Sequence, residues 1–103
     1  MMDLSERAQQ LHDKYRQSLP EKCEQLQRSY DAALLDPAST EPLYQALHKL
    51  AGSAGMYGFE ELSQLSSELL VMLDVSSDIG DNGAGDFAKV FAQLQLLLKN
   101  SAK

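Results

Sequence analysis

One histidine in the sequence lies on a helix face that carries almost no other side-chain bulk. Residues 47–58 hold one of the two histidines, His48, and three of the six glycines, Gly52, Gly55 and Gly58. At 100° per residue, Gly52 and Gly55 point within about 40° of the His48 direction. A glycine inside a helix costs about 0.5–1 kcal/mol relative to alanine, so these two glycines need a reason. We expect that another molecule approaches His48 closely.

The chemistry available to this histidine is nucleophilic. An imidazole with the ordinary pKa of about 6.5 is largely neutral at pH 7, so a ring nitrogen can accept a phosphoryl group and pass it on. A nearby cation would stabilise the phosphate, and Lys49 is the nearest candidate. The sequence has no G-x-x-x-x-G-K-[ST] loop and no H-E-x-x-H pair. It also offers no convergent acidic or hydroxyl groups near His48, which argues against a small enzyme that uses a histidine general base.

Apolar residues at helical spacing predict an all-α fold that positions this histidine. On the helix that carries His48, the apolar residues form a stripe on the opposite face, which consists of Leu43, Ala46, Leu47, Leu50, Ala54 and Tyr57. Similar stripes predict helices over about residues 3–16, 19–35, 41–57, 59–74 and 86–100. Because the links between the long helices are mostly short, we expect an antiparallel up-down four-helix bundle with a short extra N-terminal helix. The whole chain, residues 1–103, would form this single domain.

Two helix boundaries carry explicit signals. Ser18 and Glu21 can form a capping box with Pro20 in the first turn, which predicts a helix start there. Gly58 is placed to end the central helix in a left-handed conformation. The acidic, glycine-containing stretch 74–85 fails as a calcium loop, since Gly80 and Lys89 stand where ligands are required. We interpret it as a polar connection.

Composition excludes several classes of function. The net charge of −6 argues against nucleic-acid binding, which needs clustered lysine and arginine. The one cysteine, Cys23, allows no intramolecular disulfide, and its place on an apolar stripe predicts a buried, inert thiol. The remaining histidine, His12, is interpreted as a solvated surface residue, and no metal site is expected. The chain has no signal-peptide pattern and no apolar run of membrane-spanning length, so we expect a cytoplasmic, monomeric protein.

These residues resemble a known signature. The pattern His48-x-Leu50-x-Gly52-Ser53-Ala54, with Gly58 ten residues after the histidine, is similar to that of histidine-containing phosphotransfer (HPt) domains. The resemblance extends over the whole chain in length, in helix number and in the position of the histidine on the second bundle helix. It implies a free-standing phosphocarrier rather than an enzyme with its own ATP site.

The resemblance also implies partners and roles. His48 would take a phosphoryl group, through its outward-facing Nε2, from the aspartyl phosphate of one receiver domain and pass it to another; a hybrid sensor kinase would be among the partners. Gly52 would clear the approach, with Gly55 beside it. Apart from the resemblance, we expect partner specificity to lie in side chains that surround His48 on the central and following helices, such as Tyr44, Gln45, Met56 and Gln64. Mg²⁺ would belong to the receiver, so the chain would need no cofactor of its own.

One departure from the family pattern leaves a second interpretation open. Many members carry a lysine three residues after the histidine, where this chain has Ala51. Lys49 remains, but it points about 100° away from His48 on a helix, so its role in stabilising phosphate is a hypothesis. The alternative function is an HPt-like docking module that binds and inhibits a receiver domain or sensor kinase without carrying phosphate. Such a module would tolerate His48→Gln.

Overall fold

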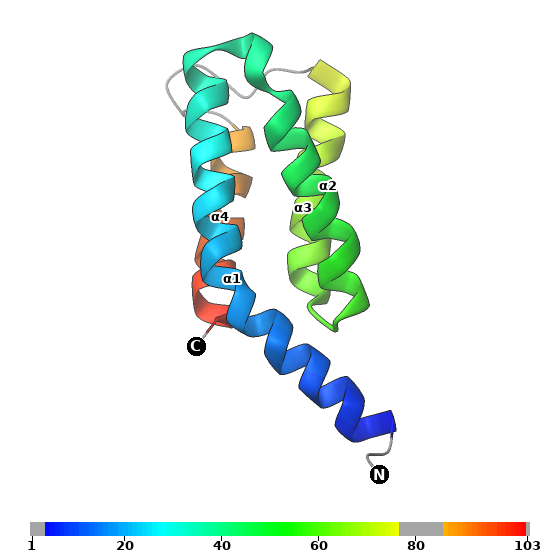
Figure 1. Ribbon diagram of the computed structural model, residues 1–103. Coiled ribbons are helices and arrows are strands. Elements are labelled where there is room, and N and C mark those ends of the chain that lie inside the picture. The colour runs from blue at the N-terminus through cyan, green and yellow to red at the C-terminus, as the bar shows by residue number, and fades with distance from the viewer. Residues whose placement is uncertain (1–3, 77–85, 103) are drawn as a thin grey trace.

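Four α-helices form a bundle in the computed structural model, which describes residues 4–76 and 86–102. The elements are α1 (Leu4–Leu35), a single 3₁₀ turn (Pro37–Ser39), α2 (Glu41–Met56), α3 (Glu60–Ser76) and α4 (Asp86–Ser101). In Figure 1, α1 and α3 run upward whereas α2 and α4 run downward. α2 packs against α3, α3 against α4, and α1 against both α2 and α4. The predicted all-α bundle is thus confirmed, and the described residues contain no strand.

The core is built from the apolar stripes that the sequence predicts. α2 contributes the four buried residues Leu43, Leu47, Leu50 and Ala54, with Ala46 and Tyr57 half-buried against them. The other helices add buried leucines and aromatics, namely Leu19, Leu26, Tyr30, Leu62, Leu69, Leu73, Phe87, Phe91, Leu94 and Leu98. Each fully buried side chain of this size contributes about 1.5–3 kcal/mol relative to exposure. This burial fixes which face of α2 points outward.

The predicted break between an N-terminal helix and the first bundle helix is wrong. Residues 4–35 form one continuous helix, α1, with Pro20 inside it. Ser18 does not cap a helix start; its Oγ donates to the Tyr15 carbonyl at 2.6 Å. A proline inside a helix removes one hydrogen bond and bends the chain, at a cost of about 3 kcal/mol. Figure 1 shows the blue N-terminal part of α1 running obliquely away from the bundle.

The reason for this continuity is packing on both sides of the proline. Tyr15 and Leu19 are buried before Pro20, and Cys23 and Leu26 are buried after it, on one continuous helix face. Pro20 itself is exposed, so the backbone carbonyl that loses its partner lies on the solvent-facing side. Burial of the apolar face therefore outweighs the local preference of Pro20 for a first turn.

The end of α2 follows the predicted glycine geometry. Gly58 has φ +90° and is the residue with positive φ that follows the helix. The Phe59 N–H donates to the Ala54 carbonyl at 2.8 Å, and the Gly58 N–H donates to the Gly55 carbonyl at 3.4 Å. These two bonds form a Schellman motif, which satisfies the last carbonyls of the helix. The sharp turn brings α3 directly alongside α2.

The stretch on which the calcium-loop interpretation falls lies mostly at residues 77–85, outside the described residues. Within residues 4–76 and 86–102, no helix combines the length and the apolar character needed to cross a membrane.

Candidate functional site

His48 stands exposed near the middle of α2, on the face opposite the buried leucines. Its ring lies parallel to that of Tyr44, one turn earlier, with centroids 6.4 Å apart and an interplanar angle of 7°. Tyr44 is half-buried, so it gives this face of α2 a fixed aromatic neighbour. Among the described residues, the His48 imidazole makes no hydrogen bond and no ion pair. Both ring nitrogens are therefore open to an approaching reagent.

Gly52 leaves the surface beside His48 empty. A Cβ added at Gly52 would meet no atom within 4 Å. Helical side chains lean toward the N-terminus and cover the turn before them, so a long side chain at position 52 would extend over His48. The predicted position of Gly52 on the histidine face agrees with this geometry. A glycine there gives a partner room at the imidazole.

Gly55 has a different environment. A Cβ added there would lie 3.2 Å from Ser63 Oγ on α3, closer than ordinary contact. The Ser63 hydroxyl donates to the Ala51 carbonyl at 2.7 Å, which ties α3 to the backbone of α2. Gly55 thus has a packing reason, close helix contact, in addition to the docking role predicted for it. The sequence pattern alone does not separate these two roles.

Lys49 and Gln45 are exposed on α2 but point to different surroundings. Gln45 Nε2 donates to Glu41 Oε1 at 2.8 Å along the helix. Lys49 lines a groove between α1 and α2, together with Lys22 of α1. This agrees with the helical angle that turns Lys49 away from His48. Ala51 is half-buried at the position three residues after the histidine.

Tyr15 and His12 of α1 make contacts that the sequence does not predict, Tyr15 with α2 and His12 with Phe59 just before α3. The buried Tyr15 hydroxyl lies 2.7 Å from Ser53 Oγ, which in turn donates to the Lys49 carbonyl at 2.8 Å. Burial raises the pKa of Tyr15, although the hydrogen bond to Ser53 opposes the shift. His12 is not the solvated residue that was predicted: it is half-buried and stacks on Phe59, with ring centroids 4.3 Å apart.

Of the remaining candidates, Cys23 lies in the core, whereas Met56 and Gln64 lie on the surface. Cys23 is buried, its thiol lies 3.0 Å from Gln95 Oε1, and burial raises its pKa. In the described part of the chain, no group of three or more His, Cys, Asp or Glu side chains could hold a metal ion. Met56 is 77% exposed at the end of α2, and Gln64 is exposed on α3. The chemistry that this arrangement supports is therefore centred on His48.

Comparison with known proteins gives one match. A family model described as the Hpt domain matches residues 10–102. No curated protein and no solved structure matches the chain.

Proposed function

The chain belongs to the Hpt domain family, and we propose that His48 carries a phosphoryl group between the aspartates of receiver domains. Hpt domains are histidine phosphotransfer modules of two-component signalling, and they are phosphocarriers rather than kinases. The observation that carries the proposal for this chain is the exposed His48 imidazole, free of hydrogen bonds to the described residues, next to the open surface at Gly52.

The transfer needs no acid or base from this chain. A lone pair on His48 Nε2 attacks phosphorus, the P–O bond of the aspartyl phosphate breaks, and the aspartate leaves as a carboxylate. The proton that neutral His48 carries on Nδ1 stays on the ring or leaves to water. The return step reverses these bond changes on a second receiver. What the bundle contributes is a nucleophile held in place and unobstructed, because in-line attack requires the reacting atoms at about 3–3.5 Å.

Several partners follow from this proposal. The receiver domain of a hybrid sensor kinase would supply the phosphoryl group, and Mg²⁺ would be held by the receiver. The chain would act as a monomer in the cytoplasm. Its net charge of −6 makes nucleic acid an unsuitable partner. Removal of Mg²⁺ with a chelator should stop transfer between receiver and His48, yet leave the already phosphorylated chain intact.

The second candidate is the docking module that binds without carrying phosphate. One observation favours it: the residue three positions after His48 is Ala51 rather than a cation, and Lys49 lies in the groove between α1 and α2. Without a cation beside His48, a phosphoryl group would have less electrostatic support. The docking module therefore differs from the carrier in one measurable respect, the presence of label on His48.

The experiment uses purified receiver domains encoded by the same genome, each phosphorylated with radiolabelled acetyl phosphate and Mg²⁺. The carrier predicts acid-labile, base-stable label on the wild type and on His12→Gln, none on His48→Gln, and onward transfer to a second receiver. Label on neither wild type nor variants, despite measurable receiver binding, would contradict the carrier and support the docking module. Label retained by His48→Gln would contradict the assignment of the residue.

A further inference from the structure

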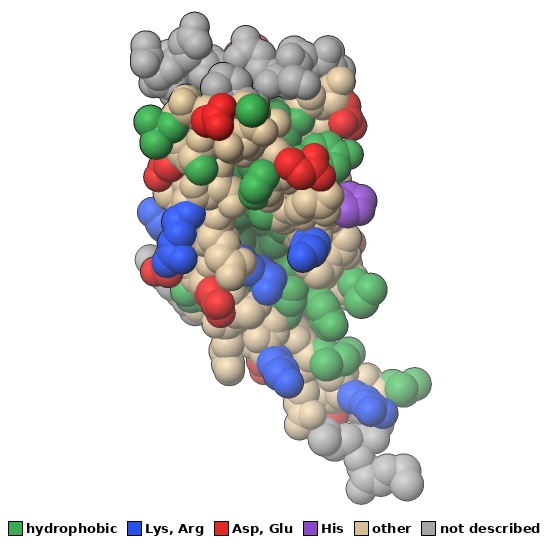
Figure 2. Space-filling model, turned by 45° about the horizontal axis from the view of Figure 1, so that its top comes forward, with side chains coloured by type: hydrophobic (Ala, Val, Ile, Leu, Met, Phe, Trp, Pro, Cys, Tyr) green, Lys and Arg blue, Asp and Glu red, His purple; other side chains and the backbone are tan. Residues whose placement is uncertain are grey.

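A groove runs between α1 and α2 beside the face that carries His48. Its volume is about 400 Å³, and its floor is apolar, with Leu26, Ala46 and Leu50. Two lysines, Lys22 of α1 and Lys49 of α2, also line it. Figure 2 shows this hollow with green side chains inside and blue side chains at its border. We call it the α1–α2 groove.

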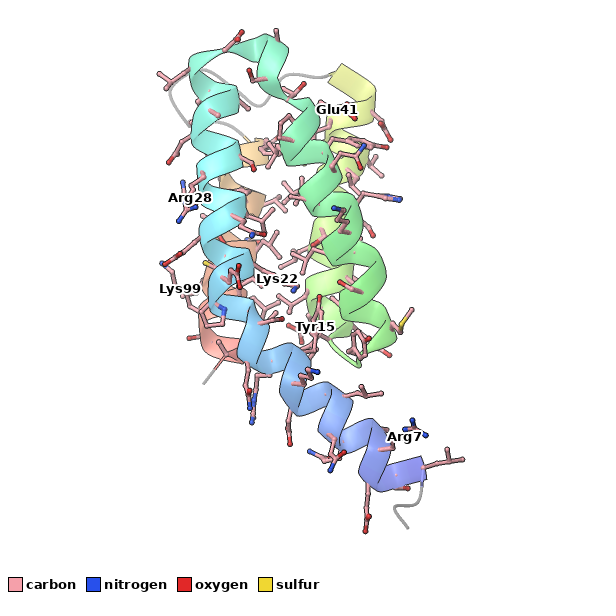
Figure 3. All side chains as sticks on the ribbon, viewed as in Figure 1. Arg7, Tyr15, Lys22, Arg28, Glu41 and Lys99 are labelled. Carbon is pink, nitrogen blue, oxygen red and sulfur yellow. The ribbon has the colours of Figure 1, made fainter. Side chains whose placement is uncertain are left out.

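Lys22 is fixed in position without being neutralised. Its Nζ donates to Ser18 Oγ at 3.0 Å and stands 5.0 Å from the centroid of the Tyr15 ring. A hydroxyl and an aromatic face hold an ammonium group in place but leave its charge uncompensated. Figure 3 shows Lys22 and Tyr15 directed from α1 toward the space beside α2.

Lys49 adds a second uncompensated charge to the same groove. Its side chain is exposed, and neither Lys49 nor Lys22 forms an ion pair within residues 4–76 and 86–102. The chain as a whole has 15 acidic and 9 basic residues. Two unpaired cations over an apolar floor are thus a local exception in an acidic protein. Such a groove suits an apolar group that carries a negative charge.

The position of the groove indicates which molecule brings that group. Lys49 directly follows His48, so the groove begins one residue and about 100° around the helix from the imidazole. A stable protein interface covers about 800 Å² on each partner, a disc about 16 Å in radius. The outer part of an interface centred on His48 therefore reaches Lys49, at the edge of the groove nearest to the imidazole. The helix on the other side of α2, α3, contains no lysine or arginine and exposes Glu60, Glu61 and Glu68. A carboxylate of the partner would therefore find its cations on the groove side of α2.

We propose that the α1–α2 groove is a second contact for the receiver domain that docks on His48. The groove receives an apolar side chain of the receiver next to a carboxylate, which pairs with Lys22 and Lys49. The contact rests on the proposed function and deepens it, because it would select among receivers that all bring the same aspartyl phosphate to His48. Lys22 and Lys49 act here as specificity residues, and neither takes part in the bond changes.

The test compares two pairs of charge reversals in a His48→Gln background, where no phosphate moves. Lys22→Glu with Lys49→Glu alters the groove, and Lys89→Glu with Lys99→Glu changes the net charge equally on α4. The affinity of the receiver that transfers phosphate to the wild type is measured for both. We expect about tenfold weaker binding for the groove pair, with a flatter salt dependence, and a change below about twofold for the control pair.

A second pair of variants guards against loss of folding. Lys49→Glu alone reverses an exposed charge without disturbing Lys22, and we expect about threefold weaker binding. Ala46→Leu fills the groove without changing charge and should also weaken binding, while the thermal melting curve shows a folded bundle. Equal affinity of the wild type, the groove variants and the control pair would overturn the proposal.

The failure of this inference differs from the failure of the proposed function. Label on His48 together with unchanged binding of the groove variants would remove only the groove contact. Absence of binding to every receiver tested would contradict the proposed function and, with it, the groove contact. Saturable binding of anilinonaphthalene sulfonate in the groove, with no competition by the receiver, would assign the groove to small amphipathic anions and overturn the proposal.

Discussion

Gly52 offers a change that should block phosphotransfer while making the protein more stable. The change is Gly52→Gln, in the interior of α2 one turn after His48. A Cβ at this position meets nothing within 4 Å, so the new side chain fits without strain. Because it leans toward the N-terminus of the helix, it comes to lie over the His48 imidazole.

Two magnitudes follow from this geometry. Replacing an exposed helix-interior glycine by glutamine gains about 0.5 kcal/mol, which raises the melting temperature by about 2–4 °C for a domain of this size. Transfer from a receiver should fall at least about 100-fold, since a displacement of about 1 Å from the in-line geometry already costs that much. Stability and activity would change in opposite directions.

The assay separates a blocked partner from a damaged nucleophile. Receiver-dependent labelling is measured beside chemical labelling with phosphoramidate, a small donor that needs no protein docking. Gly52→Gln should lose the first and keep the second within about tenfold, because a small molecule still reaches a ring nitrogen. Gly52→Ala, which adds only the Cβ, should keep both and gain about 1 kcal/mol in stability. Wild-type transfer rates for Gly52→Gln would refute the reasoning about this face.

Close packing and burial inside the bundle lead to three further predictions. Gly55→Ala should gain less stability than Gly52→Ala, because its Cβ would lie 3.2 Å from Ser63 Oγ; in urea unfolding the deficit, about 1 kcal/mol, should disappear in a Ser63→Ala background, and additive effects would contradict the contact. Cys23, buried with a raised pKa, should react with a disulfide reagent at least about 100-fold more slowly in the folded protein than in urea, and equal rates would contradict its burial. Burial raises the pKa of Tyr15 above the ordinary value of 10.0, so the unfolded state loses its proton first: the stability contribution is complete below pH 10 and declines as the pH rises through the folded pKa. Tyr15→Phe should show a smaller decline in alkaline urea titrations, and an unchanged decline would contradict this cause.

The sequence predicts most of the bundle because its apolar stripes have a clear helical period. The stripe through Leu43, Leu47, Leu50 and Ala54 places His48 on the outer face of α2, and these four residues are buried. The role of Gly58 in ending α2 is equally predictable, since a Schellman motif requires a residue that tolerates positive φ. In these cases the local signal and the tertiary packing agree.

The predicted helix start near Pro20 is wrong because packing overrides a local signal. The local sequence predicts a helix start at Ser18, Pro20 and Glu21. The buried face nevertheless continues from Tyr15 through Leu19, and α1 is one continuous helix. The signal was present in the spacing, because Tyr15 and Leu19 are four residues apart across the supposed boundary. His12 is a different case. Its stacking on Phe59 depends on how α1 meets the start of α3, which no local pattern contains.

Gly55 shows a third kind of limit. Helical angles place Gly52 and Gly55 on the same side as His48, but they cannot show that α3 approaches one of them. The distance to Ser63 gives Gly55 a packing role, whereas the empty space at Gly52 points to a partner. Glycines with the same sequence signal thus have different physical reasons.

The most direct test of the central claim is phosphorus NMR of the chain after it has been mixed with a phosphorylated receiver and Mg²⁺. Wild type, His12→Gln and His48→Gln are compared under the same conditions. If His48 carries the phosphoryl group, a resonance of an N–P bond is present in the wild type and in His12→Gln and absent in His48→Gln. The same resonance in His48→Gln, or its absence from the wild type while the receiver loses phosphate only to water, would contradict the account.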